Sequence, residues 1–141
     1  MTSSSPHPYM TCREFLAMAI AFEQDAAQFY RDLQQNVEDE TARQLLALLE
    51  KQERDHERVL KGFTPSEPNA IIQFPPELIK TMPPKPDGPI ALSQLIELAI
   101  ERERRTKEAY RTAAHSVSGA FRDLAEGLAK FEEEHEDKLK S

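Results

Sequence analysis

Two Glu-x-x-His motifs in this 141-residue chain offer residue types that bind metal ions. The first motif is Glu53 with His56, and the second is Glu132 with His135. Residues three apart share one face of a helix, so each motif can direct a carboxylate and an imidazole toward one point. Carboxylate oxygen and imidazole nitrogen without sulfur favour iron or manganese over a thiolate type of zinc site.

The two motifs belong to an internal repeat. The segment LEKQERDHERVL (49–60) aligns with LAKFEEEHEDKL (128–139) at an offset of 79 residues. Upstream, AIAFEQDAAQFYR (19–31) aligns with AIERERRTKEAYR (99–111) at an offset of 80 residues. In each half of this second alignment a glutamate precedes a tyrosine by seven residues. These residues are Glu23 and Tyr30 in the first half, and Glu103 and Tyr110 in the second.

The elements that must position these residues are helices. Apolar residues recur at helical spacing in four blocks, which predicts long helices over about 12–35, 41–61, 91–115 and 120–140. Strand-like alternation is not sustained anywhere. We therefore predict an all-α, four-helix bundle made of two repeated helical hairpins.

The connection between the two hairpins is long and rich in proline. Eight prolines between residues 62 and 90 exclude a continuous helix there, and we expect an extended crossover on the bundle surface. We expect a single domain over residues 10–141, and a disordered start at residues 1–9.

The glutamates fall at matching levels of the two hairpins. Glu23 and Glu53 are equidistant from residue 38, inside the first predicted turn, and Glu103 and Glu132 are equidistant from the second. Each lies about 15 residues from its turn, roughly 22 Å along a helix. All four, with the two histidines, continue the apolar stripes of their helices. Because unpaired buried carboxylates are strongly unfavourable, four such charges call for two divalent cations.

Composition excludes several classes of protein. The formal net charge of −7 argues against a nucleic-acid partner. The longest apolar run, residues 15–22, is too short to span a bilayer, so we expect no membrane partner. The start carries no secretory pattern, which predicts a cytoplasmic protein. A single cysteine excludes an internal disulfide and a cysteine-based metal site. We expect the charged runs ERERR (101–105) and EEEHED (132–137) mostly to face water, apart from the residues named above.

The order E-x6-Y, E-x-x-H, E-x6-Y, E-x-x-H resembles the rubrerythrin branch of the ferritin-like superfamily, over about residues 12–62 and 91–140. The resemblance implies a ferritin-like fold that holds two iron ions, with manganese or zinc as alternatives. The ligands implied by the resemblance are Glu23, Glu53, His56, Glu103, Glu132 and His135.

The resemblance also implies roles within this set. Glu53 and Glu132 would bridge the two metal ions, while Tyr30 and Tyr110 would donate hydrogen bonds to ligand carboxylates. Rubrerythrins usually carry a further glutamate one turn after the third-helix ligand, where this chain has Thr106. They also carry a C-terminal rubredoxin domain, which we expect to be lacking here.

The function implied by the resemblance is that of a di-iron oxidoreductase, which oxidises bound ferrous iron with peroxide or dioxygen. Re-reduction would then need an external electron donor. One alternative is an iron-handling protein, either a ferroxidase or a storage protein. Another is a helical interaction module with a structural or empty metal site. We also expect a homodimer, because the proline-rich crossover would allow hairpins to exchange between chains.

Overall fold

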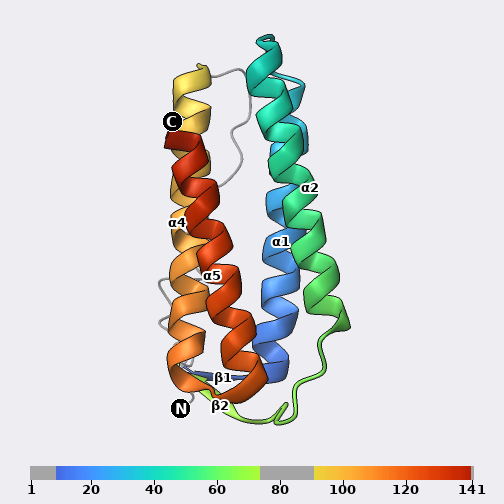
Figure 1. Cartoon of the computed structure of the whole chain (residues 1–141), viewed down its shortest axis with the longest axis vertical. Coiled ribbons are helices and arrows are strands. Elements are labelled where there is room, and N and C mark those ends of the chain that lie inside the picture. Colours follow the sequence, from blue (N-terminus) through green and yellow to red (C-terminus); the bar gives the residue numbers. More distant parts are fainter. Residues whose placement is uncertain (1–8, 74–90, 141) are drawn as a thin grey trace, which may run out of the picture.

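The computed structural model describes residues 9–73 and 91–140, which form four long helices and a small two-stranded sheet (Figure 1). The helices are α1 (Cys12–Gln34), α2 (Glu40–Gly62), α4 (Leu92–Ser116) and α5 (Gly119–Lys140). Helices α1 and α2 pack along each other as one antiparallel hairpin, and α4 and α5 form the other. The predicted all-α, four-helix bundle is therefore confirmed.

Local sequence signals set the starts of the first two helices. Thr11 precedes α1, where its hydroxyl accepts a hydrogen bond from the Glu14 N–H at 3.1 Å, and the Glu14 carboxylate accepts one from the Thr11 N–H at 2.8 Å. Asp39 precedes α2 and accepts a hydrogen bond from the Ala42 N–H at 2.8 Å. These contacts satisfy backbone donors that the first turn of a helix leaves unpaired.

The apolar core consists of two clusters at opposite ends of the bundle. The cluster where α1 and α5 begin includes Phe15, Leu60, Ile72, Tyr110, Phe121 and Leu128. The cluster at the other end includes Phe29, Leu33, Leu46, Leu49, Leu95 and Leu139. The glutamates and histidines singled out above lie on the same helices between these two clusters. The core thus contains a polar layer with apolar packing on both sides.

A short antiparallel sheet, which the sequence analysis did not predict, lies at one end of the bundle (Figure 1). Strand β1 (Tyr9–Thr11) pairs with β2 (Ile71–Gln73), with Met10 opposite Ile72. Ile72 is fully buried in the core. The pairing corrects the expectation that Tyr9 is disordered and gives the start of the crossover a fixed place. Strands of three residues are too short to show alternation in a sequence, and here they are stabilised by each other and by the buried isoleucine.

Two sequence-based expectations concern segments outside the described residues. These are the remainder of the expected disordered start, residues 1–8, and the remainder of the expected crossover, residues 74–90. Within the part of the chain that the structure does describe, no helix is both long enough and apolar enough to cross a membrane.

Candidate metal centre

The structure brings together all six residues that the sequence analysis selected as metal ligands. Helices α1 and α4 each contribute one glutamate, and α2 and α5 each contribute a glutamate and a histidine three residues later. None of the six side chains is more than 7% exposed. The residues are Glu23, Glu53, His56, Glu103, Glu132 and His135. Helical spacing aims each Glu-His pair at one point, and the facing hairpins place the two points next to each other.

The donor atoms form two overlapping groups, each confined within 4.8 Å. One group is Glu23, Glu53, His56 and Glu132, and the other is Glu53, Glu103, Glu132 and His135. Only the glutamates of α2 and α5 belong to both groups. Two neighbouring cations could therefore each have one histidine and one glutamate of their own and share the other two glutamates.

The histidines lie between the carboxylates. Nδ1 of His56 is 3.5 Å from a Glu23 oxygen and 3.4 Å from a Glu132 oxygen. Nδ1 of His135 is 2.8 Å from a Glu53 oxygen and 3.4 Å from a Glu103 oxygen. The two imidazole rings are stacked, with centroids 5.6 Å apart and planes 9° from parallel. Each histidine thus faces carboxylates of both hairpins.

Two buried tyrosines connect the hairpins at this level. Tyr110 on α4 donates a hydrogen bond of 2.5 Å to Glu23 on α1, and Tyr30 on α1 donates one to Glu103 on α4. The pKa values of both phenols lie well above their usual range, first because of burial and then because of the nearby carboxylates. Both tyrosines therefore remain hydrogen-bond donors, and each fixes the orientation of one carboxylate.

Burial and mutual repulsion perturb the charged groups of the cluster. The pKa values of Glu53 and Glu132 lie well above their usual range because of burial, and further because the other carboxylates are close. Burial alone would lower the pKa of His135, but contacts with Glu103 and Glu53 outweigh burial and raise it to about 10. Without a cation, the cluster therefore holds protons that a divalent metal ion would displace.

The residues fit a metal-binding role because many of their inward-facing atoms lack hydrogen bonds. One or more side-chain atoms of each of the six residues are buried without a hydrogen-bond partner. These atoms are Glu23 Oε2, Glu53 Oε1 and Oε2, His56 Nδ1, Glu103 Oε2, Glu132 Oε1, and His135 Nδ1 and Nε2. Buried polar atoms are normally paired, and hard oxygen donors with imidazole nitrogen suit a divalent transition-metal ion.

Some charged residues expected to face water do not. Arg102, within the run ERERR, is 7% exposed, and its guanidinium pairs with Asp25 and lies 4.5 Å from the ring centroid of Phe29. Glu136, within EEEHED, is also 7% exposed and forms an ion pair of 3.0 Å with Lys107. Charged runs usually lie on solvated faces, and these two residues are buried because an oppositely charged partner is available on a neighbouring helix.

Thr106 lies one turn after Glu103, at the position where rubrerythrins usually carry a further glutamate. Its hydroxyl donates a hydrogen bond of 2.9 Å to the backbone oxygen of Arg102, and the residue is 8% exposed. Thr106 therefore adds no carboxylate to the cluster.

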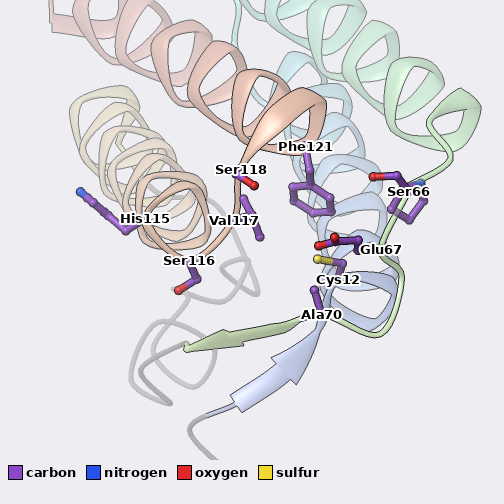
Figure 2. A pocket seen from close by; sticks show the side chains of 10 residues that line it. Cys12, Ser66, Glu67, Ala70, His115, Ser116, Val117, Ser118 and Phe121 are labelled. Atoms are coloured by element: carbon purple, nitrogen blue, oxygen red, sulfur yellow. The ribbon is translucent and has the colours of Figure 1, made fainter.

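The single cysteine lies away from this centre, in a pocket of about 240 Å³ near the start of α1 (Figure 2). Cys12 lies close to Glu67 and Phe121, whereas His115 points away from them (Figure 2). Burial, with a smaller effect of Glu67, raises the pKa of the thiol. Among the described residues, the groups able to hold a metal ion all belong to the Glu and His cluster.

Comparisons with known proteins agree with this geometry. The family model described as Rubrerythrin matches residues 14–141. The structure is similar to that of a hypothetical protein from Pyrococcus furiosus, with 25% identity and a TM-score of 0.72, over 93% of this chain and 87% of the other. It is also similar to a protein from Thermotoga maritima described as a ferritin-like diiron-carboxylate protein. That match has 19% identity and a TM-score of 0.75, over 96% of this chain and 95% of the other. A search of curated proteins gives no significant match.

Proposed function

Because the chain belongs to the rubrerythrin family, we propose that it is a di-iron oxidoreductase that oxidises bound ferrous iron with hydrogen peroxide or dioxygen. The observation that carries this proposal is the buried cluster in which two donor groups share Glu53 and Glu132. The match to a diiron-carboxylate protein supports iron as the metal.

The two overlapping donor groups support a proposal of two neighbouring ions. Glu23 and His56 would hold one ion, Glu103 and His135 would hold the other, and Glu53 and Glu132 would bridge them. When two ferrous ions are bound, they supply the two electrons that, with two protons, reduce one hydrogen peroxide molecule to two water molecules. Zinc or manganese could occupy the same donors, but zinc would not supply these electrons.

The residues of the chain itself keep the reaction inside the bundle. The apolar clusters on both sides of the centre exclude bulk water, which strengthens electrostatic interactions among the buried groups. Tyr30 and Tyr110 hold Glu103 and Glu23 in place through hydrogen bonds. The four carboxylates would favour the higher charge of oxidised ions held between them.

Re-reduction requires electrons from outside the described bundle. A rubredoxin iron site needs four cysteines, and this chain has only Cys12. We therefore propose that a separate redox protein or domain donates the electrons.

The test is anaerobic loading with ferrous iron, followed by addition of peroxide or dioxygen. We expect about two irons per chain, and an absorption spectrum of a ferric pair after oxidation. His56→Ala should lose much of the bound iron and the oxidation. His115→Ala, which removes an exposed histidine outside the cluster, should retain both.

Other outcomes identify the alternatives. If His56→Ala had unchanged metal content and thermal stability, the protein would be a helical interaction module without a functional metal centre. Oxidation that ends in a large mineral store inside a multi-subunit shell would instead indicate iron storage.

A further inference from the structure

A small cavity between α1 and α4 is lined both by Glu103 of the candidate metal centre and by the Asp25–Arg102 ion pair. Its inner wall is formed by Glu103, Tyr30 and Thr106, and its outer wall by Asp25 and Arg102. Its volume of about 10 Å³ suits a single water-sized molecule. The cavity therefore lies between a proposed metal ligand and an ion pair of which only the aspartate is exposed.

The outer wall is a contact that can open. The side chain of Asp25 is 66% exposed, whereas that of Arg102 is 9% exposed, and the two form an ion pair between the helices. Phe29 supports the guanidinium from within, at 4.5 Å from its ring centroid. Because Asp25 faces water, its carboxylate can move away from Arg102 and remain solvated, so the contact can open from the Asp25 side.

The charges and surfaces of the cavity favour a small uncharged molecule. Asp25 and Arg102 offset each other's charge at the outer wall, so the entrance offers no net charge that would draw in an ion. The side wall contains Phe22, Ala26 and Phe29, which offer no ligand to a hydrated ion. Thr106 stands beside Glu103 on the inner wall and is not a carboxylate. Its hydroxyl already donates a hydrogen bond to the backbone oxygen of Arg102.

We propose that this cavity is the entry route of the small uncharged oxidant, hydrogen peroxide or dioxygen, and that the Asp25–Arg102 ion pair closes it. The inference rests on the proposed function, because an oxidant route has a purpose only if the centre is oxidised. Arg102 and Asp25 are gating residues in this proposal, and they do not touch the proposed metal ions.

The first test uses the metal-free protein and needs no activity. In a Cys12→Ser background, Thr106→Cys places one thiol on the inner wall of the cavity. We measure its rate of modification by uncharged methyl methanethiosulfonate and by the cationic trimethylammonium-ethyl analogue. The matched control is Ala113→Cys, at a fully buried position of the same helix that does not line the cavity.

The gate predicts a specific pattern of rates. The uncharged reagent should modify the thiol at position 106 faster than the cationic reagent does. Adding Asp25→Asn should raise the rate by about fivefold, the change in open population expected for loss of an ion pair whose carboxylate is exposed. Adding Ala26→Leu, which fills the cavity, should lower it. The proposal would be overturned if Thr106→Cys reacted at the same rate alone, with Asp25→Asn and with Ala26→Leu. It would also be overturned if these two substitutions changed the rate of Ala113→Cys equally.

The second test uses the iron-loaded protein in stopped-flow experiments with each oxidant separately. Ala26→Leu should slow oxidation of bound ferrous iron without changing the iron stoichiometry, whereas Ala17→Leu, at an exposed position of α1, should not. Ala26→Val provides a smaller filling if the leucine disturbs folding. Slowing with either oxidant supports the route and identifies the molecule that uses it.

The two proposals fail in different ways. Unchanged rates with both oxidants in the filled variants would overturn the entry route while leaving the oxidoreductase proposal intact. Absence of iron oxidation in the unmodified protein would overturn the oxidoreductase proposal, and thiol reactivity would then still report whether the gate opens.

Discussion

The carboxylate of Glu53 is fully buried and lies close to three other carboxylates. A carboxylate in this setting destabilises the metal-free fold unless it is protonated, because burial and repulsion both disfavour its charge. The same carboxylate would become favourable once divalent cations were bound, because its charge would then face positive charge as well as the other carboxylates. Stability without metal and affinity for metal are therefore opposed at this residue.

Glu53→Gln should reveal this opposition, because glutamine keeps the shape and removes the charge. We expect the free energy of unfolding of the metal-free protein to rise at neutral pH by about 1 kcal/mol, the ordinary scale of a single substitution, because the variant carries no buried charge that its neighbours repel. Metal binding should weaken strongly. Urea unfolding in the presence of a chelator, followed by circular dichroism, measures the first effect.

The matched control is Glu134→Gln, which removes one negative charge from an exposed position on α5. This variant should change neither unfolding nor metal content appreciably. If Glu53→Gln instead destabilised the protein in the presence of the chelator, the charge of Glu53 would not be a cost to the metal-free fold.

At the scale of elements, the sheet of β1 and β2 attaches the start of the crossover to the base of the bundle. Ile72 is fully buried among residues of α1, α4 and α5, whereas its neighbour Ile71 is 57% exposed. Three-residue strands contribute little by pairing alone. The sheet therefore acts mainly by placing one isoleucine in the core.

Ile72→Ala should lower the free energy of unfolding by about 2–5 kcal/mol, the range for truncation of a buried isoleucine. Ile71→Ala removes the same atoms from an exposed position in the same strand and should cost far less. Urea unfolding of both variants makes the comparison. Equal, small effects would mean that the crossover does not contribute to the core.

The helices and the cluster were predictable because their signals are periodic and repeated. Each helix has more than 20 residues, long enough for apolar spacing to be unambiguous. The internal repeat aligns Glu23 with Glu103 and Glu53 with Glu132, so both halves indicated the same positions.

The missed features depend on contacts between distant segments. The burial of Arg102 requires Asp25 and Phe29 on another helix, and neither partner can be identified from the run ERERR. Strand β2 becomes recognisable only through its pairing with β1. Periodicity along the chain contains no information about such partners.

At the scale of the whole molecule, the centre connects stability to pH. The pKa of His135 is raised to about 10, so above its ordinary pKa of about 6.5 the folded chain binds a proton that the unfolded chain has released. The raised pKa values of Glu53 and Glu132 act in the same direction. The folded state therefore holds more protons than the unfolded state, and its stability falls as pH rises.

The metal-free protein should accordingly show a lower Tm at pH 8.5 than at pH 6.5. A bound divalent ion replaces these protons, so metal affinity should rise with pH over the same range, and protons should be released on binding. Thermal unfolding with a chelator and with zinc, together with a pH-stat measurement during zinc addition, tests both statements. Zinc is suitable because it occupies the site without redox chemistry.

His135→Gln provides the control, since it removes the group whose raised pKa spans this range. The pH dependence of Tm should become shallower in this variant, while the fold remains helical by circular dichroism. A metal-free protein whose Tm rises from pH 6.5 to pH 8.5 would show that the cluster holds no excess protons. Its buried carboxylates would then be compensated in some other way, and divalent cations would not be needed to complete this core.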